Sequence, residues 1–180
     1  MNTLSISKRI GKAVRPICML SLALVSAPAW SEPDQARYEM SVFSDAAYGT
    51  KILAGKYKQA IGKISSKNSS RNEFQRKTNL CVAYTKSGEI ELAEMACEEA
   101  VVAAKVMKAH RSSSGMSDSS QKTRNRFVAI ALSNRGVINA VKGDLESARK
   151  DFDAALQLSS ALSSVRANLE RLEVARQDSV

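Results

Sequence analysis

The sequence predicts an all-α protein in which helical hairpins stack into a right-handed α-α superhelix, closed by a C-terminal capping helix. A short phrase, Gly-x-apolar-x-x-Ala, occurs three times, at residues 55–60, 88–93 and 143–148. The first two copies begin 33 residues apart, which is close to the period of helical-hairpin repeats. Aromatic residues make up only 5% of the chain and there are only three Pro, a balance that favours helices over a β-sandwich or barrel.

Apolar periodicity places the helices in order around these phrases. Before Gly88, apolar residues recur at helical spacing from Phe74 to Tyr84, and after it they do so from Ile90 to Ala104. The glycine supplies the left-handed residue that ends one helix, and the alanine lets two helices approach closely. We therefore expect helices at 41–54, 57–66, 71–86, 90–110, 123–142, 144–158 and 161–177.

Polar stretches separate these predicted helices. Residues 65–70 form a polar connector, and the Ser-rich residues 111–120 have the composition of a flexible loop. The last helix has one apolar stripe and a charged back, as expected of a cap over the final hydrophobic face. We expect one domain over 41–180, preceded by a flexible segment at 30–40. Within it we expect repeats at about 41–73, 74–110 and 123–158, a loop at 111–122 and a capping helix at 161–177.

The first 29 residues have the pattern of a secretory signal peptide. Four basic residues without an acid precede an apolar run from Ile17 to Val25, and Ala27-Pro28-Ala29 supplies a small-residue cleavage site. A retained anchor would need about 20 apolar residues, more than this run provides. Cys18 opens the run, whereas a lipid-attachment cysteine would close it. We expect a periplasmic or secreted protein without a membrane span after cleavage, and a formal net charge that falls from +9 to +5 when the four leader charges are removed.

With these residues laid out, the chain resembles the tetratricopeptide-repeat (TPR) family, and in particular its small exported bacterial members of uncharacterised function. The family pattern places a small residue and a Tyr on the first helix, and Ala, an aromatic residue and a second Ala on the other helix. The third copy fits it with Gly136, Ala148, Phe152 and Ala155. The second copy has Leu80, Cys81, Tyr84, Ala93, Cys97 and Ala100 in the corresponding places.

The chain also departs from the family pattern. The first copy matches only at Ala60 and Ile64, no copy ends in Pro, and none has the early Trp. The second and third phrases begin 55 residues apart, which is longer than one repeat. A regular groove across residues 111–122 is therefore an open question.

The two cysteines of the predicted domain are expected to form a disulfide. Cys81 and Cys97 lie equally far from the turn at residue 89, so they are at the same height in an antiparallel hairpin. An exported chain enters an oxidising compartment, and a loop of this size is stabilised by about 3 kcal/mol in the chain-entropy model. The alternative is a pair of small buried thiols.

The resemblance also implies a peptide-binding face. Asn79 and Asn134 both lie nine residues before the glycine of their phrase, where Asn in the resembled family can hold a peptide backbone because its amide both donates and accepts. The alternative is a surface Asn without a ligand. By the same spacing, further residues are expected to face this groove: Val82, Lys86, Val137 and Val141.

Basic residues flank the predicted loop on both sides: Lys105, Lys108, Arg111, Lys122, Arg124 and Arg126. Clustered cations can bind an anionic envelope surface or an acidic protein. The alternative is a set of solvated helix ends, where cations are favoured by the helix dipole. We do not expect a nucleic acid partner, because interleaved aromatic residues are absent from this stretch.

No pattern in the sequence indicates catalysis, a cofactor or a metal. His110 is the only histidine, and no His, Cys, Asp or Glu cluster has metal-ligand spacing. We therefore expect a non-enzymatic module that binds a peptide or helix of another protein. The alternatives are a repeat protein that associates with itself as a homo-oligomer, and an electrostatic adaptor that uses the basic residues at 105–126.

Overall fold

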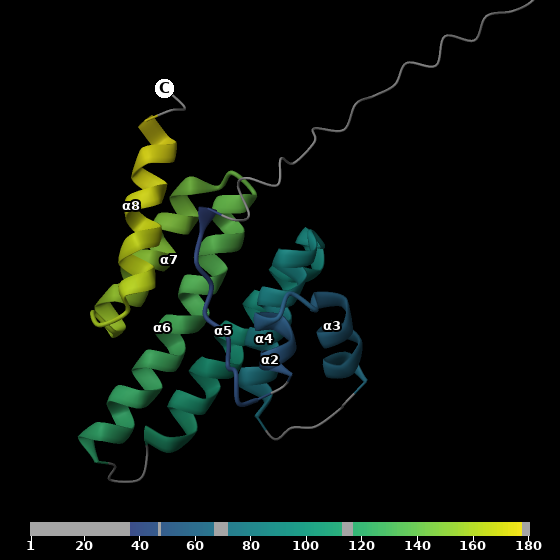
Figure 1. Ribbon diagram of the computed structural model, residues 1–180. Helices are drawn as coiled ribbons and strands as arrows, with labels where there is room; N and C mark the ends of the chain where they lie inside the picture. The colour runs from purple at the N-terminus through teal and green to yellow at the C-terminus, as the bar shows by residue number, and fades with distance from the viewer. Residues whose placement is uncertain (1–36, 47, 67–71, 113–116, 178–180) are drawn as a thin grey trace, which may run out of the picture. The chain divides into compact units, whose positions relative to one another are not determined.

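The computed structural model describes residues 37–46, 48–66, 72–112 and 117–177, with side chains of 108–112 excluded. All regular elements in these ranges are helices, and helices that follow one another along the chain pack side by side (Figure 1). Their bounds are α2 Gly49–Leu53, α3 Tyr57–Ser65, α4 Glu73–Ser87, α5 Ile90–Ser112, α6 Asp118–Val141, α7 Leu145–Leu158 and α8 Ser163–Gln177. The predicted signal peptide, most of the 30–40 segment, and parts of the 65–70 connector and of the 111–122 loop lie outside the described residues.

The three repeated phrases form the three turns that the sequence predicts. Gly55, Gly88 and Gly143 have φ of 71°, 80° and 84°, in the left-handed region that favours glycine. At the second turn, Glu89 N donates to the Tyr84 carbonyl at 3.0 Å, which satisfies one carbonyl at the end of α4. The alanine of each phrase is fully buried, at Ala60, Ala93 and Ala148.

The core consists of two neighbouring clusters of apolar side chains. One joins the α5, α6, α7 and α8 helices around Phe152, Val137 and Leu172. The other joins α2, α3, α4 and α5 around Ile52, Ile64 and the two cysteines. Both clusters extend under residues 38–43, because Met40 packs against each of them.

The prediction of a first helix at 41–54 is wrong for its first half. Residues 39–43 have no regular secondary structure, and α2 covers only Gly49–Leu53. In a helix, the backbone N–H and C=O groups of these residues would form hydrogen bonds within the segment itself. In the structure they bond instead to side chains of three distant helices. The α6 helix also begins at Asp118, so the predicted loop at 111–122 is shorter than expected.

Candidate functional site: three asparagines around an extended segment

Residues 38–43, called here the resident segment, run across three helices of the fold. The segment, purple to dark blue in Figure 1, passes over α8, α6 and α4. These three helices are not neighbours in sequence. The α4 helix is the first helix of the second hairpin, α6 is the first helix of the third hairpin, and α8 is the capping helix.

One asparagine from each of these helices binds the backbone of the resident segment. Asn168 accepts from Glu39 N at 2.8 Å and donates to Glu39 O at 2.7 Å. Asn134 accepts from Ser41 N at 2.9 Å and donates to Ser41 O at 2.9 Å. Asn79 accepts from Phe43 N at 2.9 Å, and donates to Phe43 O at 3.0 Å and to Ala46 O at 2.8 Å.

These three residues, Asn79, Asn134 and Asn168, are called here the asparagine triad. They bind the backbone of every second residue of an extended chain. In an extended chain the N–H and C=O of one residue point to the same side, and those of the next residue point to the other. An asparagine amide can donate and accept at once, so it matches both groups of one residue. All three asparagines are 0% exposed, and a buried amide without partners would be costly. The resident segment therefore satisfies the asparagines as much as they hold it.

The apolar side chains of the resident segment pack against the core of the helical fold. Tyr38 is buried, and Met40 and Val42 pack against the core clusters. The ring of Phe43 meets those of Phe74 and Phe127, with centroid distances of 5.2 and 5.7 Å at edge-to-face angles. Such aromatic contacts add to the apolar burial and fix the position of the segment along the helices.

An ion pair also holds the segment at its first residues. Glu39 accepts from Arg171 of α8 at 2.8 Å, and the same arginine donates to Asn168 Oδ1 at 3.2 Å. Both charged side chains are partly exposed, so this pair contributes little to stability by itself. It does orient the Asn168 amide.

The structure places the predicted groove residues in two different environments. Asn79 and Asn134 lie where an extended backbone binds, but the backbone is the chain's own. The three predicted valines are buried in the core rather than facing an open groove: Val82, Val137 and Val141. Lys86 is half-buried, and burial lowers the pKa of its ammonium group.

Asn168 and the resident segment are parts of the site that the sequence did not predict. Asn79 and Asn134 are found by counting back from the glycine of their phrase. Asn168 cannot be found in this way, because the capping helix carries no Gly-x-apolar-x-x-Ala phrase. The resident segment did leave a signal, because Tyr38, Met40 and Val42 alternate with Glu39 and Ser41. An apolar-polar alternation of period two indicates an extended chain, and this signal could have identified the segment.

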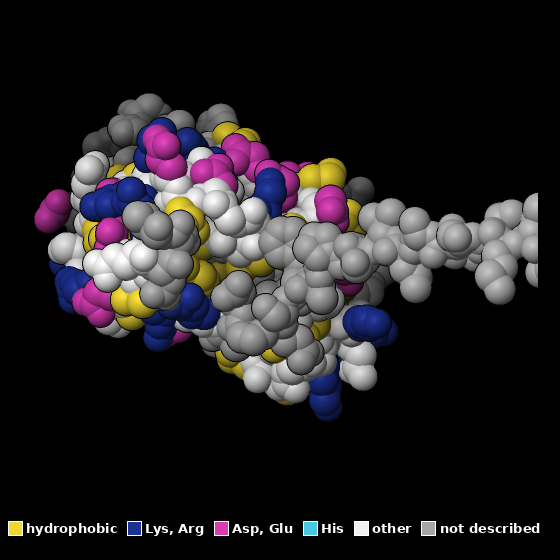
Figure 2. Space-filling model, turned by 90° about the horizontal axis from the view of Figure 1, so that it is seen from above, with side chains coloured by type: hydrophobic (Ala, Val, Ile, Leu, Met, Phe, Trp, Pro, Cys, Tyr) yellow, Lys and Arg dark blue, Asp and Glu magenta, His cyan; other side chains and the backbone are white. Residues whose placement is uncertain are grey.

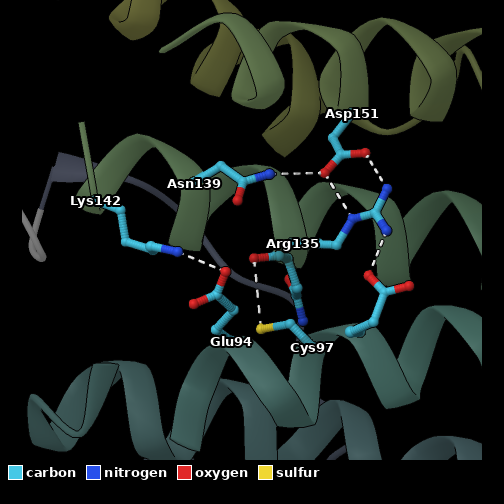
Figure 3. Close-up of polar contacts among 8 residues, drawn as sticks. Glu94, Cys97, Arg135, Asn139, Lys142 and Asp151 are labelled. Atoms are coloured by element: carbon cyan, nitrogen blue, oxygen red, sulfur yellow. Dashed lines mark hydrogen bonds and ion pairs between the residues drawn. The ribbon is translucent and has the colours of Figure 1, made fainter. Parts of the chain in front are cut away.

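The predicted pairing of the cysteines is confirmed. Cys81 of α4 and Cys97 of α5 form a disulfide with Cα atoms 4.7 Å apart, and both are fully buried. Cys97 Sγ also lies 3.9 Å from the backbone carbonyl of Asn134. Cys97 therefore lies directly beside the part of α6 that carries the central asparagine of the triad (Figure 3).

A second group of polar side chains connects α5, α6 and α7. Arg135 donates to Asp151 of α7 at 2.6 and 2.8 Å and to Glu98 of α5 at 2.5 Å, and Asn139 donates to Asp151 at 3.2 Å (Figure 3). Hydrogen bonding to Asp151 raises the pKa of the Arg135 guanidinium above its usual range. These contacts satisfy a largely buried carboxylate, so we assign them to packing between hairpins.

The predicted basic patch is only partly a surface feature. Lys105, Lys122 and Arg126 are exposed, whereas Arg124 is 5% exposed and donates to Gln121. The side chains of Lys108 and Arg111 lie outside the described residues. On the face drawn in Figure 2, basic and acidic side chains are interspersed.

Two hollows border the site. One of about 580 Å³ adjoins the resident segment and is lined by residues 41–45, by 161–164 and by Thr123, Arg126, Phe127 and Ile130 of α6. The other, of about 740 Å³, lies between α4 and α5 and is lined by Phe74, Val102 and Val106 among others. The first opens beside the segment that the asparagine triad holds, so it belongs to the candidate site.

Neither a candidate metal centre nor a membrane-spanning helix occurs within the described ranges. No group of three or more His, Cys, Asp or Glu side chains could hold a metal ion among these residues. No described helix is long and apolar enough to cross a membrane.

Comparisons with family models, with curated proteins and with solved structures found no match for this chain.

Proposed function

We propose that this protein is a non-catalytic, TPR-like binding module whose helices receive an extended segment of a partner protein. The observation that carries this proposal is the asparagine triad. All three amides are fully buried and bond to backbone groups of the segment; Asn79 also donates to Ala46 O, and Asn168 also accepts from Arg171. Recognition of main chain is largely independent of sequence, so the same face suits a segment of another protein as well as the chain's own.

The TPR-like architecture is part of the same proposal. The recurring elements that support it are the left-handed glycine between paired helices, the buried alanine five residues later, and the asparagine nine residues before the second and third glycines. The irregular first copy and the long α5 and α6 helices distinguish this chain from a regular array.

The location of the partner follows from the N-terminal sequence. The basic leader, apolar run and small-residue site support export, and a disulfide in the second hairpin suits an oxidising compartment. We therefore propose that the partner is met in the periplasm or outside the cell.

Site-specific photo-crosslinking in the cells that make the protein tests the proposal. Benzoylphenylalanine in place of Ser163, which is exposed and lines the hollow beside the resident segment, should give an adduct with another protein. The matched control is the same group in place of Lys150, an exposed residue of α7 away from that hollow. Adducts from position 163 alone support the proposal. No adduct, or equal adducts from both positions, contradicts it, and an adduct of twice the monomer mass indicates self-association.

A further inference from the structure

The resident segment has two edges, and the asparagine triad uses only one of them. Glu39, Ser41 and Phe43 direct their N–H and C=O groups toward the helices, where the asparagines bind them. Because consecutive residues of an extended chain alternate, Met40 and Val42 direct theirs to the opposite edge, away from the triad.

That opposite edge has no partner within the described part of the chain. The backbone N–H and C=O of Met40 and Val42 take part in no hydrogen bond there, although each neighbouring residue makes two or more. Both residues are partly exposed, so these groups are within reach of solvent. An unpaired edge of this kind is a template for another strand.

We propose that an extended segment of a partner protein pairs with this edge and forms a two-stranded ribbon on the floor provided by the helices. This inference rests on the proposed function and names the mode of binding: the resident segment stays on the asparagine triad, and the partner pairs with its outward edge instead of replacing it. Two donors and two acceptors, spaced two residues apart, match an extended backbone and not the outside of a helix, whose backbone groups are used internally.

The surroundings of the edge specify the partner further. Arg126 and Asp45 are both exposed and line the hollow of about 580 Å³, but they form no ion pair with each other, and no ion pair within the described residues engages Arg126. Side chains of a paired strand alternate between its two faces, so those on the hollow side would lie near this cation. The partner segment should therefore carry an acidic residue there. A second folded copy fits less well, because Glu39, the acidic residue of its own segment, is already paired with Arg171.

Proline substitutions test the two edges of the segment one at a time, because each removes a single backbone N–H. Val42→Pro removes the outward N–H and keeps all contacts of Asn134 and Asn79, since proline also holds the preceding residue in an extended conformation. Val42→Ala is the matched control, because it shortens the same side chain and keeps the N–H. Ser41→Pro removes the inward N–H that Asn134 accepts. Met40→Pro repeats the test at the other outward residue.

The probe is the capped heptapeptide Thr-Val-Thr-Val-Glu-Thr-Lys, titrated into the mature, oxidised chain and followed by NMR chemical shifts. We expect shifts at the amides of Met40 and Val42, with binding unchanged in Val42→Ala and weakened about tenfold or more in Val42→Pro and Met40→Pro. Thermal unfolding of each variant establishes that it is folded.

Other outcomes overturn the inference. Equal binding by Val42→Pro and Val42→Ala, or no binding by the parent chain, excludes pairing at this edge. Tighter binding by Ser41→Pro, with Val42→Pro unchanged, would show that the peptide displaces the resident segment instead. In each case crosslinks from position 163 would still test the proposed function separately, because they do not depend on how the partner binds.

Discussion

The second and third hairpins hold their two helices together at equivalent positions, one through a disulfide and the other through a buried aromatic ring. Cys81 and Gly136 both lie two residues after the asparagine of their hairpin, and Cys97 and Phe152 both lie nine residues after its glycine. In the α4–α5 hairpin the two positions are joined by a disulfide. In the α6–α7 hairpin the glycine receives the phenylalanine ring, and a Cβ added to Gly136 would come within 2.7 Å of Phe152 Cε1.

The comparison shows what each solution requires. The disulfide needs an oxidising compartment but little volume, and it acts mainly by restricting the unfolded chain. The aromatic solution needs a glycine opposite it, and it acts through the apolar area that Phe152 buries. In both hairpins the result is a first helix held firmly enough to present a buried asparagine to the resident segment.

Removal of the ring should break the third hairpin most severely. Phe152→Ala leaves a cavity next to Gly136 in the larger core cluster, and we expect a loss of about 3–5 kcal/mol in the free energy of unfolding. Urea unfolding monitored by circular dichroism measures it. A loss below that of the double cysteine variant would mean that the bond, not the ring, is the stronger of the two solutions.

Removal of the disulfide should weaken the second hairpin by less. Cys81→Ala with Cys97→Ala is expected to cost about 3 kcal/mol in the free energy of unfolding, since it releases a loop with a sequence separation of 16. Reduction of the parent chain is the matched test, and the intact mass should rise by about 2 Da on reduction. Unchanged stability after reduction would contradict this account of the hairpin.

The asparagines should behave alike in the two hairpins despite the different packing behind them. Asn134→Ala leaves the N–H and C=O of Ser41 without a partner, and Asn79→Ala leaves the N–H of Phe43 without one. We expect a loss of about 2–3 kcal/mol from either. Asn139→Ala is a control on α6, because this residue contacts Asp151 and not the segment. If Asn139→Ala costs as much, the triad has no special part in stability.

A methyl group at Gly136 tests how tightly the Phe152 ring packs against α6. Gly136→Ala forces the Phe152 ring to move, and we expect a cost of about 1–2 kcal/mol from overpacking. Gly62→Ala, at a helical glycine with open space around its Cβ position, is the control and should be neutral or stabilising. Equal stability of the two variants would show that the ring has room to shift.

The smallest expected difference is in acid. Asp144 caps α7 by accepting from Ser147 N at 3.0 Å, and this contact with Ser147 lowers the pKa of its carboxyl group. The cap is therefore fully present above the ordinary Asp pKa and is lost as pH falls through the lowered value. Asp144→Asn, which keeps a capping oxygen, should be less sensitive to acid. Identical acid unfolding of both chains would contradict this role.

Much of the fold follows from local rules in the sequence. Helical periodicity and the three glycines locate α3 to α8 within a few residues, and equal distance from a turn pairs Cys81 with Cys97. The same rule pairs Arg135 with Asp151 about Gly143, although that pair was not predicted.

The resident segment could not be placed by such rules. Its conformation depends on asparagines 36, 93 and 129 residues away along the chain, on helices that must first pack before their amides line up. A local window shows only that the segment alternates. It does not show which side chains would bind the backbone. The sequence therefore predicts an empty groove for a partner, whereas the chain's own residues 39–43 occupy it.

Amide hydrogen exchange along residues 39–43 measures directly whether the asparagine triad binds the backbone of the resident segment. The N–H groups of Glu39, Ser41 and Phe43 are bonded to buried asparagines, so they should exchange slowly, while those of Met40 and Val42 should exchange quickly in the isolated protein. An alternation of slow and fast amides is the predicted result. Uniformly fast exchange over these five residues would contradict the binding of the segment by the asparagine triad.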